Sequence, residues 1–122
     1  MASLKTILVV EDNNNQLLLY KQELSLEGYN IITAKDYCEA LKKVKEHSPD
    51  MVITDIILPK MDGIELMDRI MSERKKIPII INTAYSCYKD NFMTWVADAY
   101  IIKSSDLSEL KNKIKEFLGK TE

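Results

Sequence analysis

The chain has 122 residues, of which 46% are hydrophobic and 30% charged, and its formal net charge is −2. This length and composition are typical of one globular domain with its own apolar core, and they exclude a disordered or fibrous protein. The slightly acidic balance excludes a broad cationic surface, so we expect no direct binding of nucleic acid. No apolar run resembles a signal peptide or approaches the roughly 18 residues of a membrane span, so we expect no membrane contact and a cytoplasmic location.

Five short apolar runs predict five β-strands. Each has four or five mainly aliphatic or β-branched residues and ends at polar ones, as expected for strands buried on both faces of a parallel sheet. In chain order the predicted strands cover residues 6–10, 30–34, 51–55, 79–83 and 99–103.

Apolar residues recur at helical spacing between and after these runs. The first helix carries Leu17, Tyr20 and Leu24 on one face, is capped by Asn13 or Asn14, and stops at Gly28. The second and the last helix are each predicted to begin at a reciprocal capping pair, Asp36 with Glu39 and Asp106 with Glu109. The last helix has an apolar stripe of Leu107, Leu110, Ile114, Phe117 and Leu118.

The third and fourth helices have weaker patterns. Residues 64–71 carry apolar positions at helical spacing, whereas residues 88–96 show them only roughly, so we expect a short fourth helix there. Cys38 and Cys87 lie far apart without a CxxC spacing, which favours reduced packing residues over a zinc or redox site. His47, the sole histidine, is interpreted as a cation at a helix end or an exposed residue rather than a phosphodonor or metal ligand.

This order of elements predicts an α/β fold. Five strand-then-helix units imply a parallel sheet covered by helices on both faces, because parallel strands need right-handed crossovers. The expected architecture is flavodoxin-like, a doubly wound (βα)5 sheet with strand order 2-1-3-4-5. In such sheets the site lies at the carboxyl ends of the strands, near the switch point between the first and third strands.

Polar residues follow four of the five predicted strands at that edge: Glu11, Asp12, Asp55, Thr83 and Lys103. Carboxylates repel one another, at roughly 4 kcal/mol for a pair about 4 Å apart at an effective dielectric near 20, so the cluster predicts a hard cation such as Mg²⁺. A carboxylate nucleophile, a metal, an ammonium and a hydroxyl are the parts that phosphoryl transfer needs. Since the chain has no glycine-rich phosphate loop, the donor should be a phosphorylated group on another molecule.

These residues resemble the receiver domains of two-component response regulators, in particular single-domain regulators of the chemotaxis or sporulation type. The resemblance extends from residue 7 to about residue 118, so we expect one receiver domain over residues 1–122 and no output domain. It rests on Glu11-Asp12, residues 55–63, Thr83-Ala84 and residues 97–103.

The resemblance implies a role for each residue of the site. Asp55 would be the phosphoacceptor, and Thr83 and Lys103 would contact the phosphoryl oxygens. The ligands of Mg²⁺, or of Mn²⁺, would be Glu11, Asp12, Asp55 and the backbone carbonyl of Ile57. Thr83 and Tyr100 would act as switch residues that reshape the face formed by the fourth helix, the fifth strand and the fifth helix.

It also implies the partners. The phosphoryl group would come from a histidine kinase or a histidine phosphotransfer protein, and the reader would be a downstream protein or an output domain outside this chain. The domain would catalyse only its own phosphorylation and dephosphorylation, so we do not expect an enzyme in the ordinary sense.

Ser104 departs from the family pattern, which usually has Pro after the lysine, often with a cis bond. A non-proline cis bond costs about 2.5–4 kcal/mol, so a trans Lys103–Ser104 bond or a remodelled loop is expected. This departure keeps open an alternative, a phosphorylation-independent receiver-like adaptor. A phosphatase of the haloacid dehalogenase type is disfavoured, because Ile57 occupies the position of the second Asp that such enzymes need.

Overall fold

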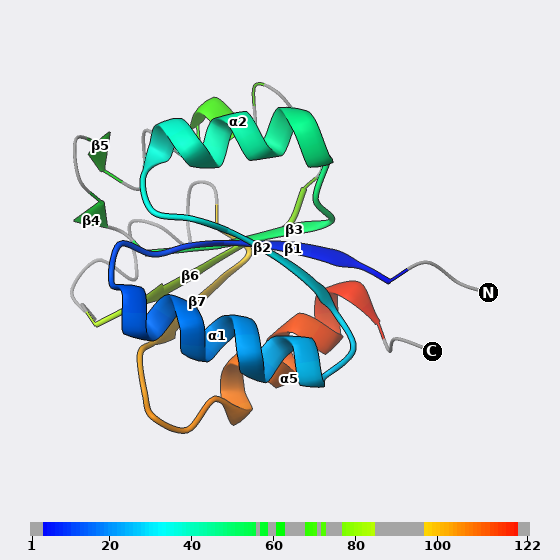
Figure 1. Ribbon diagram of the computed structural model, residues 1–122. Helices are drawn as coiled ribbons and strands as arrows, with labels where there is room; N and C mark the ends of the chain where they lie inside the picture. Colours follow the sequence, from blue (N-terminus) through cyan, green and yellow to red (C-terminus); the bar gives the residue numbers. More distant parts are fainter. Residues whose placement is uncertain are drawn as a thin grey trace.

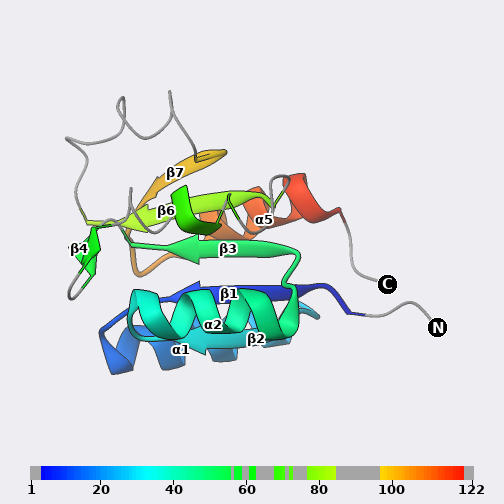
Figure 2. The same ribbon diagram turned by 90° about the horizontal axis from the view of Figure 1, so that it is seen from above.

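A five-stranded parallel sheet organises the molecule (Figures 1 and 2). Its strands are, from edge to edge, β2 (Asn30–Ala34), β1 (Thr6–Val10), β3 (Met51–Thr54), β6 (Ile79–Thr83) and β7 (Ala99–Ile102). Every neighbouring pair is parallel. In order along the chain these five strands are arranged 2-1-3-4-5, which confirms the predicted topology.

The computed structural model describes residues 4–55, 57–58, 61–62, 68–70, 72, 77–84 and 97–119, with the backbone alone at 57–58 and 61–62. The predicted fourth helix at residues 88–96, and Cys87 before it, lie outside these residues. Of the predicted third helix, residues 68–70 and 72 are helical, and Ile70 is fully buried as its stripe requires.

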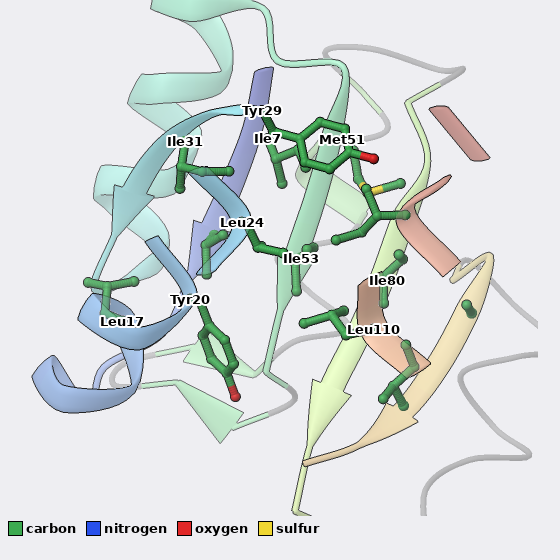
Figure 3. Packing of buried hydrophobic residues seen from close by; sticks show 14 residues of the cluster. Ile7, Leu17, Tyr20, Leu24, Tyr29, Ile31, Met51, Ile53, Ile80 and Leu110 are labelled. Carbon is green, nitrogen blue, oxygen red and sulfur yellow. The ribbon is translucent and has the colours of Figure 1, made fainter. Parts of the chain in front are cut away.

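Helices cover both faces of the sheet, as a doubly wound fold requires. Figure 1 shows α2 (Tyr37–His47) on one face, and α1 (Asn14–Leu26) and α5 (Ser108–Leu118) side by side on the other. Side chains alternate between the faces along each strand, so Leu8 and Val10 pack beneath α2, whereas Ile7 and Val9 pack against α1 and α5. We call the second set the α1/α5 cluster; Figure 3 shows it from close by.

The first two helices begin as the sequence predicts. Asn13 is the cap of α1, because its side chain accepts a hydrogen bond from the Gln16 N–H at 3.0 Å. Asp36 caps α2 by accepting from the Glu39 N–H at 2.9 Å, and Glu39 reaches back to the Lys35 N–H at 2.7 Å. In a capping box Glu39 would accept from the N–H of the cap residue Asp36, so this hydrogen bond falls one residue earlier than that pattern predicts.

The start of α5 corrects a prediction. Asp106 does not pair with Glu109; its carboxylate accepts from the N–H and the hydroxyl of Ser108, at 2.9 and 2.6 Å. The N-cap residue is Leu107, which makes no side-chain hydrogen bond. The Asp106 carboxylate instead closes a local turn with Ser108, two residues later. Of the predicted stripe on α5, Leu110 and Ile114 are buried, but Phe117 is 36% exposed.

Two further features bear on the predictions. A short antiparallel pair, β4 (Ile57–Leu58) with β5 (Met61–Asp62), follows β3 and was not predicted; Figure 2 shows β4 at the end towards which the strands of the sheet point. Among the described residues there is no cis peptide bond, so Lys103–Ser104 is trans as expected.

Two single residues were also assigned from the sequence. Cys38 is a free thiol, but it is exposed, so its predicted packing role is wrong, because it falls on the outer side of α2. His47 is exposed in the last turn of α2, in agreement with the prediction of an exposed residue at a helix end. In the described part of the chain no helix is long and apolar enough to span a membrane.

Candidate functional site

Four of the predicted site residues meet at the carboxyl edge of the sheet. Glu11, Asp55 and Lys103 directly follow β1, β3 and β7, and Thr83 ends β6. The hydrogen bonding between β6 and β7 continues one residue beyond the end of β7, since the Lys103 N–H donates to the Thr83 carbonyl at 2.7 Å. These four strands are consecutive in the sheet, so the parallel topology alone brings the four side chains together.

The side chains are linked through Asp55. The Thr83 hydroxyl donates to Asp55 Oδ1 at 2.6 Å, and the Lys103 ammonium donates to Asp55 Oδ2 at 2.7 Å. The same ammonium donates to Glu11 Oε1. Both carboxylate oxygens of Asp55 thus face hydrogen-bond donors that could equally contact the oxygens of an incoming phosphoryl group.

This site is largely shielded from solvent. Relative exposure is 2% for Glu11, 8% for Asp55 and 0% for Thr83, and 16% for the side chain of Lys103. Buried ionised groups need partners, and here two carboxylates share one ammonium. The site therefore carries an excess of negative charge.

The pKa values reflect that imbalance. Burial raises the pKa of Glu11; the Lys103 ammonium opposes this, and the neighbouring carboxylates add to it. Burial tends to lower the pKa of Lys103, but its hydrogen bonds to Asp55 and Glu11 outweigh this, so the pKa of Lys103 is raised and the amine remains protonated. The site holds a fixed cation and a carboxylate, Glu11, that is only partly compensated.

The remaining predicted metal ligands lie beside this group. Asp12 follows Glu11 directly and is exposed, and Ile57 lies in β4, two residues after Asp55. Among the described residues no group of three or more acidic, His or Cys side chains is gathered closely enough to hold a metal. The Lys103 ammonium sits between Glu11 and Asp55 and donates to both.

The donor set nevertheless fits a hard divalent cation. Glu11, Asp12 and Asp55 offer carboxylate oxygens, and these are the ligands that Mg²⁺ prefers. Two of these carboxylates are buried with one lysine between them, and a bound cation would stabilise the ionised form of Glu11, whose pKa burial raises and the neighbouring carboxylates raise further.

Tyr100 lies in β7, three residues before Lys103. It is 7% exposed, pairs in register with Ile81 of β6, and packs in the cluster beneath α2. Its ring is therefore turned inward, on the other face of the sheet from the α1/α5 cluster.

Three residues near the site were not assigned a role from the sequence. Thr54 is buried, and its hydroxyl donates to the backbone carbonyl of Asp55 at 3.0 Å. Tyr20, predicted only as part of the apolar stripe of α1, is buried, and so is Asn82 of β6, whose side chain lies close enough to lower the pKa of the tyrosine against the effect of burial. The available signal was Asn82 itself, a polar residue inside the apolar run Ile79 to Thr83.

The doubly wound sheet, with an acidic, lysine and threonine site at its carboxyl edge, defines a receiver domain. The family model of the response regulator receiver domain matches residues 7–115, and the chain belongs to that family.

Particular relatives support this assignment. The chain is 35% identical over 120 residues to the alkaline phosphatase synthesis transcriptional regulatory protein PhoP of Bacillus subtilis, covering 97% of this chain and 50% of PhoP. It is 37% identical over 114 residues to the response regulator ArlR of Staphylococcus aureus, covering 92% of this chain and 52% of ArlR. The chain thus spans about half the length of these curated relatives.

A solved structure is similar over nearly its full length. The response regulator TrrA of Thermotoga maritima, in complex with Mg²⁺ and BeF, is 44% identical and superimposes with a TM-score of 0.88, covering 93% of this chain and 99% of TrrA. A CheY-like receiver domain protein of Methanospirillum hungatei is 35% identical, with a TM-score of 0.87 over 93% of each chain. The matched fold agrees with the predicted class.

Proposed function

We propose that this domain is a phosphorylation switch that accepts a phosphoryl group on Asp55 from a phosphohistidine of a sensor kinase or phosphotransfer protein. One observation carries the proposal: Asp55 is a buried carboxylate at the sheet's switch point, with an ammonium on one oxygen and a hydroxyl on the other. Membership of the receiver family supports it.

The transfer itself is a displacement at phosphorus. A carboxylate oxygen of Asp55 forms the new P–O bond while the P–N bond of the donor breaks and the imidazole leaves. The Lys103 ammonium and the Thr83 hydroxyl, released from Asp55, donate to the phosphoryl oxygens and stabilise their charge. Because the domain acts on itself in this way and in the later hydrolysis, we do not class it as an enzyme.

Glu11, Asp12, Asp55 and the backbone carbonyl of Ile57 would hold Mg²⁺, or Mn²⁺ with the same ligands. When bound, such an ion supplies positive charge that neutralises the phosphoryl oxygens. The excess of carboxylate over ammonium at the site supports this assignment, as does the Mg²⁺ in the complex of TrrA.

Phosphorylation adds about 1.5–2 negative charges and would shift an existing two-state equilibrium. Thr83 and Tyr100 are the proposed switch residues, since one contacts Asp55 and the other lies buried in the neighbouring strand. The changed surface would include β7 and α5, together with the fourth helix predicted at 88–96.

The reader of that surface would be a partner protein or an output domain outside residues 1–122, a span that we propose is all receiver domain. The relatives PhoP and ArlR, about twice as long, are compatible with either arrangement. We propose a cytoplasmic location and no direct contact of this domain with nucleic acid or membrane.

The test is the intact mass of the protein after incubation with acetyl phosphate, with and without Mg²⁺. The wild-type chain should gain one phosphate only when Mg²⁺ is present, and Asp55→Asn should gain none. Equal incorporation by Asp55→Asn, or incorporation that ignores Mg²⁺, would contradict the proposal.

The second candidate is a phosphorylation-independent adaptor. It is favoured by one observation, that Lys103 already bridges Glu11 and Asp55 while the described residues contain no preformed metal cluster. No phosphate on the folded wild-type chain under any of these conditions would select this candidate.

A further inference from the structure

One margin of the sheet ends in an open strand. β2 comes first in the strand order, and β1 is the strand that pairs with it in the described part of the chain. Figure 2 shows β2 at the margin of the sheet. An unpaired strand presents N–H and C=O groups that a further strand can bind, and proteins commonly cover such groups with charged side chains. The outer side of β2 can therefore bind another strand unless something covers it.

The hydrogen bonds between β1 and β2 show which backbone groups point outward. The Asn30 N–H donates to the Lys5 carbonyl at 2.9 Å, and the Ala34 carbonyl accepts from the N–H of the residue after β1 at 3.0 Å. Both ends of β2 thus point towards β1, and the direction of the backbone groups alternates along a strand. The backbone groups of Ile31 and Thr33 therefore point away from the sheet. We call these groups the β2 edge.

Two side chains of α2 contact the outer side of β2. The Lys43 ammonium donates to the Thr33 carbonyl at 2.7 Å. Because a hydrogen-bond donor lies in front of the carbonyl oxygen, this ammonium occupies space that a pairing strand would need. Glu39 Oε1 accepts at 2.7 Å from the N–H of Lys35, the residue after β2. The start of α2 thus covers the carboxyl half of the outer side of β2.

The Lys43 side chain is held in this position from its own helix. Glu39 lies one turn earlier and forms an ion pair with it, with 3.8 Å between Glu39 Oε2 and Lys43 Nζ. On the other face of the sheet, Lys21 of α1 lines a small hollow together with Thr33. Lysines therefore flank the β2 edge from both helix layers.

The β2 edge is complementary to a second copy of itself. In an antiparallel pair, two opposite residues exchange both of their hydrogen bonds, and such pairs recur at every second residue. Ile31 of one copy would face Thr33 of the other, and Thr33 would face Ile31. The two copies would be related by a two-fold axis, the commonest symmetry of dimers. Both Thr33 carbonyls would be acceptors in that pair, and these are the carbonyls to which Lys43 donates.

We propose that the β2 edge is a pairing site for a second copy of this chain and that Lys43 keeps it closed. Pairing would force each ammonium to leave its carbonyl or to be enclosed at the interface, where the two like charges would be brought together. This proposal goes beyond the proposed function, because it does not depend on phosphorylation of Asp55.

Lys43→Met should open the edge, because it removes the ammonium and keeps most of the apolar stem. Lys42→Met is the matched control, since Lys42 is the neighbouring lysine of α2, is exposed, and changes the net charge equally. Lys43→Ala is a second opening variant, and Lys43→Arg keeps both the charge and the hydrogen-bond donors. Urea unfolding verifies that each variant folds.

Sedimentation over a series of protein concentrations measures self-association. Lys43→Met should dimerise at about tenfold lower concentration than the wild type and Lys42→Met, because two carbonyls per dimer become free for hydrogen bonds between strands. Lys43→Arg should match the wild type. Amide hydrogen exchange locates the interface: in Lys43→Met the N–H groups of Ile31 and Thr33 should become more protected as the protein concentration rises.

Two results would overturn the proposal. If folded Lys43→Met and Lys43→Ala associate no more than Lys42→Met does, the lysine does not keep the edge closed. If Lys43→Met associates but Ile31 and Thr33 gain no protection from exchange, the copies meet at another surface. Association of both opening variants together with protection of these two amides is the result that the proposal predicts.

Discussion

The two ends of the sheet use the same residue type for different purposes. At the amino end, the Asp50 carboxylate accepts from the Thr6 N–H and the Asp98 carboxylate accepts from the Ile79 N–H, each at 2.8 Å. Each of these aspartates also donates its own N–H to the carbonyl of the same partner. At the carboxyl end, the Asp55 carboxylate accepts from side chains instead, namely the Lys103 ammonium and the Thr83 hydroxyl.

The difference lies in what the carboxylate's partners can do. A backbone N–H in a strand is fixed, so the carboxylates at the amino end serve to tie adjacent strands together. An ammonium on a long stem and a hydroxyl can turn to a new acceptor without disturbing the sheet. We therefore expect substitutions at the amino end to change stability and substitutions at the carboxyl end to change phosphorylation.

Lys103→Met should give the largest effect. It removes the ammonium that bridges Glu11 and Asp55, so phosphorylation by acetyl phosphate should slow by about 10²–10³-fold, the usual loss for one preorganised electrostatic group. Lys111→Met is the matched control, because Lys111 is also a partly exposed lysine in an ion pair, with Glu23 at 3.0 Å. Equal slowing in both variants would remove the distinction between a site lysine and a structural one.

Thr83→Val should slow phosphorylation about tenfold, since it removes the hydroxyl that donates to Asp55 Oδ1 and keeps the side chain's shape. Thr54→Val removes a hydroxyl that donates to the backbone carbonyl of Asp55 instead. The rate of phosphorylation, measured by intact mass against time, should be nearly unchanged in Thr54→Val. A slower rate in Thr54→Val but not in Thr83→Val would contradict the account, because phosphorylation would then depend on the Thr54 hydroxyl and not on that of Thr83.

Asp98→Ala tests the amino end. Losing the bond from the Ile79 N–H should lower the free energy of unfolding by about 0.5–1.5 kcal/mol, because the N–H regains only water as a partner. Urea unfolding measures this change, and the phosphorylation rate of the folded variant should equal that of the wild type. A folded Asp98→Ala that cannot be phosphorylated would contradict the assignment of this end to stability.

Glu11→Gln should have the smallest effect, a slight gain in stability where Asp98→Ala gives a loss. The pKa of Glu11 is raised above its ordinary value of 4.5, so the folded state holds this proton more tightly than the unfolded state does. The resulting stability is present below pH 4.5 and is lost as the pH rises through the raised pKa. Without Mg²⁺, urea unfolding at neutral pH should therefore find Glu11→Gln slightly more stable than the wild type, and less stabilised by added Mg²⁺. A loss of stability at neutral pH would show that Lys103 compensates Glu11 fully.

The sequence predicted the sheet well because its strands are buried on both faces. Runs such as Ile79 to Thr83 contain hardly any residue that could face water, so their bounds and the polar residues that end them were readable directly. Parallel topology then required Glu11, Asp55, Thr83 and Lys103 to meet, as the structure confirms.

What could not be predicted depends on side-chain reach and local competition. Asp106 had two possible donors, and the nearby Ser108 prevailed over Glu109, a choice that capping patterns do not settle. The nearness of the buried Tyr20 and Asn82 brings together residues 62 positions apart in a layer that is otherwise apolar. Lys103 was expected near a phosphoryl group, but its bridge to Glu11 depends on the conformation of a flexible stem.

The most direct test of the account is to locate the phosphate. The wild-type chain, phosphorylated by acetyl phosphate with Mg²⁺, is reduced with borohydride, which converts an aspartyl phosphate to homoserine, and its peptides are sequenced by mass spectrometry. The account predicts homoserine at residue 55 and unmodified Asp50 and Asp98 at the opposite end of the sheet. Homoserine at either of those aspartates, with residue 55 still Asp, would contradict it.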